Sequence, residues 1–195
     1  MKKKINLKKF INNYNKELNN TFKNINQNEL EKIESLIKKK YQAKKNIFIC
    51  GNGGSASISN HWECDHREGI KRSKKYKPKA ISLVSNTDIM TAIANDNGYE
   101  NIFANSLDNL HNLGDLLICF SVSGNSKNII NAMKLARKRN LKIIFFGGFN
   151  GGIAKRYADY KLIFKSKNFG VVEDCFQIIM HILAQYIEKN NFIYK

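Results

Sequence analysis

Short apolar runs alternate with helical segments from residue 46 to the end of the chain. Several runs are rich in β-branched residues, and they lack the strict apolar–polar alternation of a strand with one face in water. Strands of this kind are buried on both faces. Their alternation with helices predicts an α/β fold, with a doubly wound, five-stranded parallel sheet flanked by helices. The predicted strands are residues 46–50, 80–84, 116–120, 142–146 and 161–164.

The segments between these strands have helical periodicity, and a long apolar helix is predicted to end the chain. In an open parallel sheet, ligands bind in the crevice beyond the carboxyl ends of the strands. The loops that follow the predicted strands are therefore the places to search for chemistry. The predicted helices are residues 55–68, 87–110 in pieces, 126–139, 151–157 and 171–189.

Two amphipathic helices are predicted ahead of the first strand, at residues 5–22 and 28–42. We expect residues 1–45 to form an N-terminal helical arm of the same domain, with residues 46–195 as its α/β part. The apolar stripes of the arm must be buried against something. They pack either on the domain's own sheet or in a helical bundle with partner subunits, and the sequence leaves both interpretations open.

The composition is that of a globular domain, because 43% of the 195 residues are hydrophobic and can form a core. No apolar run approaches the ~18 residues of a membrane span, and the basic N-terminus lacks the apolar centre of a signal peptide. We therefore expect a soluble cytoplasmic protein with no membrane partner. The four cysteines are far apart in the sequence, without a CxxC pair, and are expected to be buried free thiols: Cys50, Cys64, Cys119 and Cys175.

The formal net charge of +17 invites a nucleic-acid interpretation. Residues 1–45 carry thirteen Lys against four Glu, and the stretch from Arg67 to Lys79 carries seven basic residues against one acid. However, Asn and Ile are also abundant, as a codon bias would produce, and aromatic residues do not interleave the basic runs as in RNA-binding modules. We favour biased composition with anionic metabolites as ligands, and a polyanion partner is the alternative.

A glycine-rich loop, GNGGS at residues 51–55, follows the first predicted strand and precedes a helix. Glycines allow the backbone to approach an anion closely, and a helix N-terminus offers free N–H groups and the positive end of a dipole. The loop is neither the dinucleotide pattern GxGxxG nor a P-loop, so no nucleotide cofactor is expected. If this loop is considered alone, a plain glycine turn without a ligand explains its sequence nearly as well.

A serine-rich loop, SVSGNS at residues 121–126, follows the third predicted strand and also precedes a helix. Its three hydroxyl groups suit a phosphate that is bound by hydrogen-bond donors rather than by charge. Serines at a helix start are often only N-caps. Two such loops at the ends of strands in one sheet nevertheless favour a phosphorylated small molecule as the ligand.

At this point an ordered set of motifs resembles the sugar isomerase (SIS) family, and within it the bacterial heptose-phosphate isomerases. The set consists of GNGGSA, then NH with an acid four residues after the His, TAIANDNGYENIFA, SxSGNS and a C-terminal HILAQYIE. The resemblance covers about residues 40–189. It implies a phosphate site and contacts to sugar hydroxyls. The substrate-binding residues that it implies are Asn52, Gly53, Ser55, Asp96, Ser121, Ser123 and Ser126.

The resemblance also implies a set of four polar residues, His61, Asp65, Glu173 and His181, which gather around a zinc ion or act directly in catalysis. It places them at an interface between subunits of a homotetramer. Two of the four differ from the family pattern, because Asp65 stands where the family has Glu and Glu173 where it has Gln. Two imidazoles and two carboxylates still form a donor set that suits zinc.

Helical spacing supports this grouping, because His61 and Asp65 are four residues apart and Glu173 and His181 are eight apart, so that each pair shares a helix face. The alternative for His61 and Asp65 alone is a surface hydrogen bond. Asp174 would replace Glu173 if the helical register were shifted by one. The remaining histidines, His66 and His111, are expected at the surface, and the cysteines beside the site residues are expected to serve packing.

The resemblance implies an aldose–ketose isomerase that converts sedoheptulose 7-phosphate into D-glycero-D-manno-heptose 7-phosphate for a surface polysaccharide. In such chemistry a base removes a proton beside the carbonyl, an enediol forms, and an acid returns a proton to the neighbouring carbon. We expect His181 as the acid, with Asp65 and Glu173 sharing the roles of base and metal ligand. The alternatives are a non-catalytic SIS protein that binds a protein partner, of the replication-initiator type, and a sugar-phosphate sensor.

Overall fold

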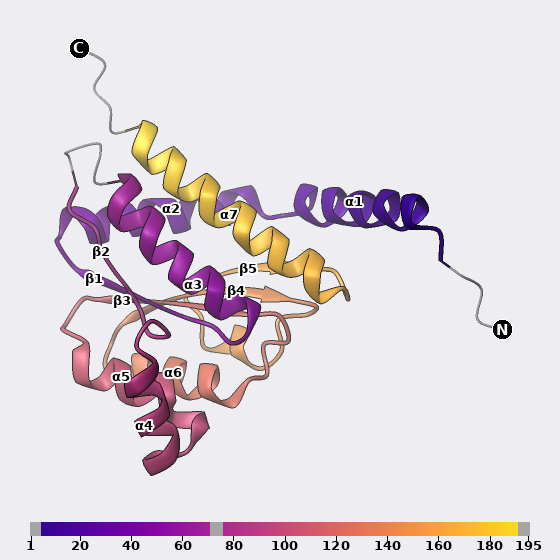
Figure 1. The fold of residues 1–195 in the computed structure, drawn as a ribbon. Helices are drawn as coiled ribbons and strands as arrows, with labels where there is room; N and C mark the ends of the chain where they lie inside the picture. The colour runs from indigo at the N-terminus through magenta and orange to yellow at the C-terminus, as the bar shows by residue number, and fades with distance from the viewer. Residues whose placement is uncertain (1–4, 71–75, 191–195) are drawn as a thin grey trace.

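A parallel five-stranded sheet forms the centre of the molecule, in the order β2-β1-β3-β4-β5 (Figure 1). The computed structural model describes residues 5–70 and 76–190. The central strands read as continuous apolar runs because helices cover both faces of the sheet. The predicted fold class is confirmed. The strands are β1 (Asn46–Cys50), β2 (Lys79–Ser82), β3 (Leu116–Ser121), β4 (Lys142–Gly148) and β5 (Tyr160–Phe164).

Helices cover the two faces of this sheet in two groups (Figure 1). The core on one face is formed with α1, α2, α3 and α7, and the core on the other face with α4, α5 and α6. In the described part of the chain, none of these helices is both long and apolar enough to cross a membrane. The helices are α1 (Leu7–Lys23), α2 (Gln27–Gln42), α3 (Gly54–Cys64), α4 (Thr87–Asn97), α5 (Ile102–Leu110), α6 (Lys127–Lys138) and α7 (Phe169–Lys189).

The helix predicted at residues 151–157 is wrong, because only a short 3₁₀ turn, Ala154–Arg156, forms there. Gly151 and Gly152 have φ values of 81° and 52°, which are incompatible with a right-handed helix. An added side chain at either glycine would collide with neighbouring atoms. The segment is therefore a tight loop rather than the first turn of a helix.

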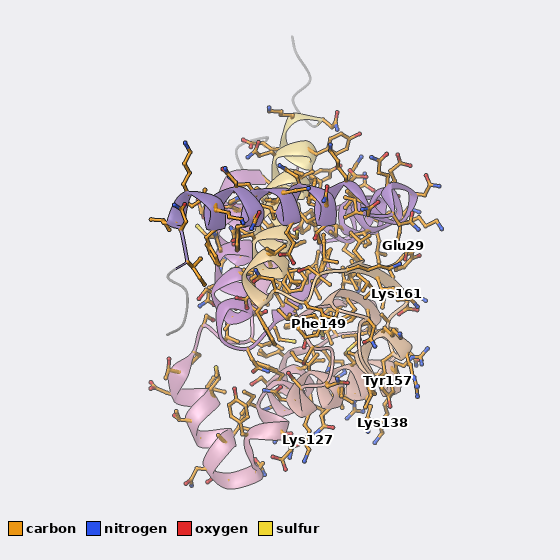
Figure 2. The ribbon with its side chains drawn as sticks, turned by 90° about the vertical axis from the view of Figure 1, so that its right-hand side faces the viewer. Glu29, Lys127, Lys138, Phe149, Tyr157 and Lys161 are labelled. Carbon is orange, nitrogen blue, oxygen red and sulfur yellow. The ribbon has the colours of Figure 1, made fainter. Side chains whose placement is uncertain are left out.

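The arm helix α2 packs on the domain's own sheet. Its residues Ile33, Ile37 and Tyr41 are buried in the same core as α7. At the edge of the sheet, Glu29 Oε1 accepts a hydrogen bond from the backbone N–H of Lys161 on β5, at 3.1 Å (Figure 2). This contact satisfies an N–H of the edge strand that would otherwise face solvent.

The other arm helix, α1, is divided between two environments. Tyr14 and Leu18 in its second half pack against the core beside α7. Its first half extends beyond the sheet (Figure 1) and leaves Leu7, Phe10 and Ile11 exposed. Packing on the own sheet thus accounts for α2 and for half of α1. The exposed first half leaves the partner-subunit interpretation open.

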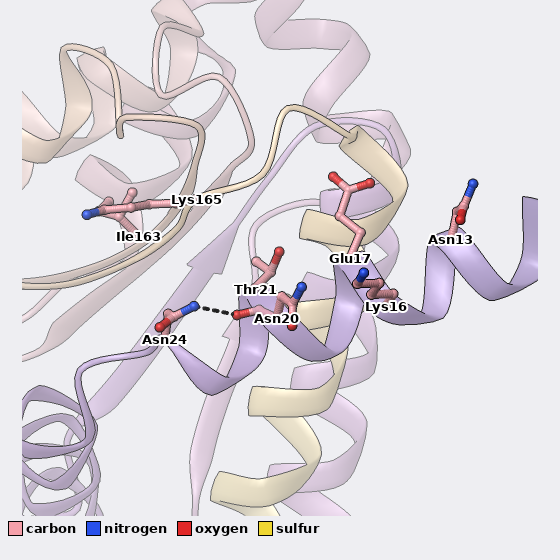
Figure 3. A pocket seen from close by; sticks show the side chains of 8 residues that line it. All are labelled: Asn13, Lys16, Glu17, Asn20, Thr21, Asn24, Ile163 and Lys165. Carbon is pink, nitrogen blue, oxygen red and sulfur yellow. Dashed lines mark hydrogen bonds between the residues drawn. The ribbon is translucent and has the colours of Figure 1, made fainter.

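A polar cleft of about 650 Å³ separates the second half of α1 from β5 (Figure 3). Its lining includes Lys16 and Glu17 together with Asn20, whose carbonyl oxygen accepts a hydrogen bond from Asn24 Nδ2 at 2.7 Å. Glu17 Oε1 also accepts a hydrogen bond from Ser166 Oγ at 2.6 Å. Side-chain hydrogen bonds therefore tie α1 to the end of β5.

His66 lies in a π-helical turn (Asp65–Gly69) that continues α3, and it is fully buried, so its predicted surface position is wrong. The ring stacks on Trp62 with centroids 4.4 Å apart, and its Nδ1 lies 2.5 Å from the hydroxyl oxygen of Tyr41. Burial lowers the pKa of His66 to about 3. His66 lies four residues after Trp62, on the same buried face, so it enters the core together with that residue.

Burial of the thiols was predicted correctly for Cys50, Cys119 and Cys175, and wrongly for Cys64. All four are free. Cys50 on β1 and Cys119 on β3 lie opposite one another in the sheet, with their sulfur atoms 3.5 Å apart. Cys64 is exposed because it lies at the end of α3, on the side away from the buried face that carries Trp62.

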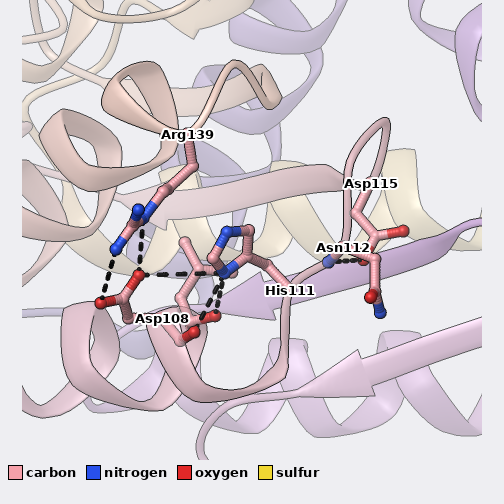
Figure 4. Close-up of polar contacts among 6 residues, drawn as sticks. Asp108, His111, Asn112, Asp115 and Arg139 are labelled. Carbon is pink, nitrogen blue, oxygen red and sulfur yellow. Dashed lines mark hydrogen bonds and ion pairs between the residues drawn. The ribbon is translucent and has the colours of Figure 1, made fainter.

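A buried carboxylate, that of Asp115 (Figure 4), ties the N-terminal ends of β1 and β3 together. Asp115 is 1% exposed and accepts hydrogen bonds from the backbone N–H of Asn46 at 2.9 Å and of Asn112 at 2.9 Å. A third comes from Asn46 Nδ2 at 3.0 Å. Nearby, Arg139 forms two hydrogen bonds to the exposed carboxylate of Asp108. These contacts lie at the opposite end of the strands from the glycine and serine loops.

We predict that Asp115→Ala lowers the free energy of unfolding by about 2–4 kcal/mol, because it leaves buried N–H groups without acceptors. Asp108→Ala is the matched control, since its ion pair with Arg139 is at the surface and contributes little. Urea unfolding followed by circular dichroism measures both. Equal effects of the two substitutions would contradict the structural role of Asp115.

We predict that His66 makes the protein less stable as the pH falls. Its folded pKa lies below the unfolded value of about 6.5, so the unfolded chain binds the proton more strongly. The contribution of His66 is fully present above pH ~6.5 and declines toward pH ~3, by at most about 1.4 kcal/mol per pH unit. His66→Gln removes this dependence. Urea unfolding at several pH values should show the stability difference between the two proteins shrinking as the pH falls; parallel curves would refute it.

Candidate active site

The two loops lie side by side because β1 and β3 are neighbours in the sheet. Cys50, the last residue of β1, pairs with Cys119 two residues before the end of β3. From β1 the chain continues through α3 to β2, whereas from β3 it continues through α6 to β4, in the opposite direction across the sheet. Such a switch point leaves a crevice at the carboxyl ends of the strands, where α/β proteins bind ligands.

The glycine loop presents the N-terminus of α3 to this crevice. Gly53 is the N-cap residue of α3, with φ 56° and no side-chain hydrogen bond to the first turn. A side chain at Gly51 would collide with the backbone of Ser55. Ser55 is 2% exposed, and its hydroxyl donates to Glu173 Oε1 on α7 at 3.4 Å. The loop therefore brings backbone N–H groups and the end of α7 together.

The serine loop is folded on itself and leaves one hydroxyl free. Ser121 Oγ accepts a hydrogen bond from Gly124 N at 3.1 Å, and Ser123 Oγ accepts one from Asn125 N at 3.2 Å. Ser126 is the N-cap residue of α6, but its side chain makes no capping hydrogen bond. A role of Ser126 as a plain helix cap is therefore not observed. Its hydroxyl has no partner among the described residues and can bind a ligand.

A pair of amides joins the two loops, and sequence reasoning missed half of it. Asn52 Nδ2 donates to Asn128 Oδ1 at 2.9 Å, and Asn128 Nδ2 donates back to Asn52 Oδ1 at 2.8 Å. Tyr99 also donates its hydroxyl to Asn52 Oδ1, at 3.1 Å. Asn52 was predicted to contact a sugar; in the structure it holds α6 against the glycine loop. One N–H of each amide remains for a ligand.

Three of the four residues in the predicted acid–base or metal group come together between α3 and α7, which lie side by side (Figure 1). His61 Nε2 lies 3.3 Å from Asp65 Oδ1, and His181 Nε2 lies 3.6 Å from Asp65 Oδ2. The two imidazole rings meet edge to face, with centroids 4.9 Å apart. One ligand atom from each residue can be chosen so that all three lie within 4.8 Å of one another. Two nitrogens and an oxygen at this spacing fit zinc.

Gln177 belongs to this group and was missed from the sequence. Its Nε2 lies 2.8 Å from His61 Nδ1 and 3.1 Å from His181 Nε2. The signal was present, because Gln177 is four residues from both Glu173 and His181 on the same face of α7. With the amide donating to Nδ1, the proton of neutral His61 lies on Nε2, facing Asp65. Gln177 thereby orients one histidine and contacts the other.

Glu173 is one turn away from this group, at the hydroxyl of Ser55, and it does not belong to the set of three. The direction of the next side chain, Asp174, shows which residue of α7 faces the site. Asp174 points to the other side, where its Oδ2 accepts a hydrogen bond from the hydroxyl of Tyr14 on α1 at 2.6 Å. Burial, and then the Asp174 hydrogen bond, raise the pKa of Tyr14 to about 12. Asp174 is therefore part of the packing of α1, and its alternative role at the site is wrong.

Asp96 stands apart from the other predicted site residues. It is exposed on α4, and its carboxylate accepts a hydrogen bond from the side chain of its neighbour Asn95 at 2.9 Å. Within the described residues no hydrogen bond or ion pair joins Asp96 to the loops or to α7. The nearest link is Tyr99, three residues further on, which reaches Asn52.

The group between α3 and α7 is open to solvent in the single chain. The side chains of His61, Asp65 and His181 are 45%, 29% and 39% exposed. On the same two helices, Trp62 and Phe176 are fully buried, and each ring packs against Phe120 of β3. The chain itself does not close the polar group off from water.

Comparisons with known proteins identify the family to which the chain belongs. A model of the SIS domain family matches residues 10–148, which contain both loops. The phosphoheptose isomerase of Clostridium acetobutylicum is 37% identical over 166 residues, which cover 84% of this chain and 84% of that protein. One from Helicobacter pylori is 37% identical over 164 residues, with 84% and 85% covered. The chain belongs to the SIS domain family.

Solved structures show the same fold for other SIS domain proteins. A phosphoheptose isomerase from Neisseria gonorrhoeae superposes with a TM-score of 0.80 at 25% identity, and covers 94% of this chain and 100% of that one. One from Francisella tularensis superposes with a TM-score of 0.88 at 24% identity, with 95% and 100% covered. The predictions of the family, the fold and an isomerase enzyme are confirmed by these relatives.

Proposed function

We propose that this SIS domain protein is an aldose–ketose isomerase of a phosphorylated sugar, with sedoheptulose 7-phosphate and D-glycero-D-manno-heptose 7-phosphate as its substrate pair. The product would serve the synthesis of a surface polysaccharide. One observation carries the proposal: a His–Asp–His group lies at the far end of α3, the helix that begins at the glycine-rich loop. A phosphate in the crevice would place the other end of a sugar chain along α3, toward His61.

The phosphate end of the substrate is assigned to the two loops. The hydroxyl groups of Ser55, Ser121, Ser123 and Ser126 would donate to phosphate oxygens, and the backbone N–H of Gly53 would add the favourable end of the α3 dipole. Support comes from the uncapped N-termini of both α3 and α6 in one crevice. The sugar hydroxyl groups are assigned to Asn52 and Asp96.

Acid–base chemistry is assigned to α7 and α3. Glu173 is outside the His–Asp–His group, so we assign it the base that removes the proton beside the carbonyl. His181 would act as the acid that returns a proton to the neighbouring carbon, and Gln177 and Asp65 would orient its ring. In the same sequence the proton of the neighbouring hydroxyl group would move to the former carbonyl oxygen, so that both oxygens of the product are neutral. Exchange with solvent would then return Glu173 and His181 to their starting protonation states. Asp65, shorter than Glu by one methylene, remains within reach of both histidines.

Zinc is the proposed cofactor, held by His61, Asp65 and His181. The donor set of two imidazole nitrogens and a carboxylate oxygen fits this ion, and a position remains for a substrate oxygen. When bound, zinc would polarise the carbonyl and the adjacent hydroxyl of the sugar. Metal binding would require both imidazoles to be neutral. His181 would then bind the ion through one ring nitrogen and carry the proton for the sugar on the other.

A homotetramer with its sites at subunit interfaces is part of this proposal. Isomerisation through an enediol benefits from exclusion of water, yet the His–Asp–His group is open in one chain. Apolar side chains are exposed on both sides of it: Leu7 and Phe10 on α1, and Ile182 and Tyr186 on α7. In addition, no residue of α4 is buried. A partner subunit that covers these helices would close the site.

The main alternative is an SIS protein that binds a sugar phosphate or a protein partner without turnover. Its phosphate loops would be the same, and the basic N-terminal arm would suit a partner. A binding protein does not require three ionisable side chains gathered beside the loops, supported by Gln177. The presence of this group favours the enzyme, and turnover distinguishes the two.

We predict that the purified protein converts sedoheptulose 7-phosphate in a coupled assay and that His181→Ala lowers kcat at least about 100-fold. His111→Ala is the matched control, because His111 lies at the end of α5 and its partners among the described residues are Leu107 and Asp108 of that helix (Figure 4). It should retain activity.

Ser126→Ala should instead raise KM, because it removes a phosphate donor. Absence of turnover with every five- to seven-carbon ketose phosphate would overturn the proposal.

We predict that the protein binds one zinc ion per chain and that Asp65→Asn weakens this binding at least about tenfold. Glu173→Gln, which makes the same chemical change outside the His–Asp–His group, should leave zinc affinity unchanged and reduce turnover. Calorimetric titration of the metal-free protein and metal analysis measure the first effect, and the coupled assay the second. Loss of zinc in Glu173→Gln and not in Asp65→Asn would reverse the two assignments.

A further inference from the structure

A second cleft, of about 810 Å³, opens beyond the carboxyl ends of β3, β4 and β5. Its walls come from the serine loop, from the loop after β4, and from β5 with the segment that follows it. Small-molecule sites in proteins have volumes of roughly 300–1,000 Å³. The cleft therefore has the size of a metabolite site. It lies beside the crevice between β1 and β3 and shares Ser123 with the proposed phosphate site.

Positive charge distinguishes this cleft. Lys155, Lys161, Lys165 and Lys167 line it, and none of its described lining residues is acidic. Within residues 5–70 and 76–190, no carboxylate forms an ion pair with any of these four lysines. Like charges around one cavity repel each other, and an anion of matching size relieves this repulsion. The cleft beside α1 shares Lys165 with this one, but it differs because Glu17 also lines it (Figure 3).

The lysines converge from different elements, and part of their positioning is built into the fold. Lys161 and Lys165 are four residues apart in extended chain and so project on one side of the edge strand. Lys155 Nζ donates to the carbonyl oxygen of Asn150 at 2.8 Å, and Lys161 Nζ approaches the carbonyl oxygen of Lys155 at 3.5 Å. Edge strands often carry lysine to prevent aggregation. That explanation covers β5 but not Lys155, which comes from the loop after β4.

The cleft also has a strained aromatic wall. Phe149 has φ 53°, a left-handed conformation that is unfavourable for a bulky residue and that clusters at ligand sites. Its ring meets that of Phe169 edge to face, with centroids 5.0 Å apart, and Phe169 is 58% exposed. Phe149 and Lys161 face the same side of the molecule (Figure 2). An apolar surface thus stands beside the lysines.

We propose that this cleft binds a small anion with two or more phosphate groups, held by its four lysines and Ser123, and that the bound anion competes with the substrate. Nucleotides and inorganic pyrophosphate share this chemistry, and the aromatic wall favours the nucleotide. Because Ser123 borders both sites, a polyphosphate here brings negative charge next to the phosphate of the sugar. The binding step is independent of the proposed isomerase activity; only the competition rests on it.

Calorimetric titration of the full chain with pyrophosphate and with ADP, at low ionic strength, tests the binding step. The double variant Lys161→Gln/Lys165→Gln should weaken both affinities at least about tenfold. The control, Lys138→Gln/Lys189→Gln, removes the same charge from exposed positions outside the cleft and should bind like the wild type. Phe149→Leu should weaken the binding of ADP but not that of pyrophosphate. An equal effect on both affinities would contradict the preference for a nucleotide, but not the polyphosphate site itself.

Two results would overturn the proposal. Equal loss of affinity in the two double variants would show attraction by net charge alone, and absence of binding by the wild type at about 1 mM probe would show that no site exists. Ser126→Ala gives a further check, because it lies outside the cleft and should leave probe binding intact. If it abolishes binding, the anion occupies the serine loop instead.

The kinetic consequence is measured separately. In the wild type, the bound probe should raise the apparent KM for the sugar phosphate without lowering kcat, and the Lys161→Gln/Lys165→Gln variant should need at least about tenfold more probe for the same effect. If the probe binds without any change in the apparent KM, the competition with the substrate is refuted, but the polyphosphate site is not. A protein that turns over no sugar phosphate still yields the calorimetric result, so failure of the proposed function and failure of this inference are distinguishable.

Discussion

The pairing of β1 with β3 in the middle of the sheet is the contact on which the rest of the molecule depends. These strands are far apart in the sequence, and the chain can join them only because both are apolar enough to be covered on both faces. From this pair the two halves of the chain proceed in opposite directions across the sheet. The crevice, the two loops and the two helix N-termini all follow from that reversal.

Much of the fold could be predicted because its determinants are local. The apolar runs gave all five strands to within two residues at their ends, since a strand buried on both faces has few polar residues to blur its limits. One helix was predicted wrongly because the backbone conformation, rather than the hydrophobic pattern, determines the structure there. Residues 151–157 contain glycines in left-handed conformations, which hydrophobic periodicity does not reveal. His66 was placed wrongly for another reason: it follows Trp62 by four residues on the buried face, but as a polar residue it was expected at the surface.

The candidate site was predictable in its types of residue but less so in its grouping. Motif order and helical spacing identified His61, Asp65 and His181, which the fold brings together. Gln177 was missed, although it has the same spacing, because an uncharged amide in an apolar helix gives little signal. Glu173 and Asp96 lie on the expected elements, where their hydrogen-bond partners are Ser55 and Asn95, and their roles at the site stay predictions.

The paired amides of Asn52 and Asn128 have a consequence for how the two loops can move. Each amide is donor and acceptor to the other, so neither loop can shift without breaking two hydrogen bonds at once. The glycine and serine loops therefore behave as a single mechanical unit, set before any ligand arrives. A ligand that meets such a unit loses little free energy to ordering the protein, and its affinity reports the fit of its phosphate rather than the flexibility of the loops.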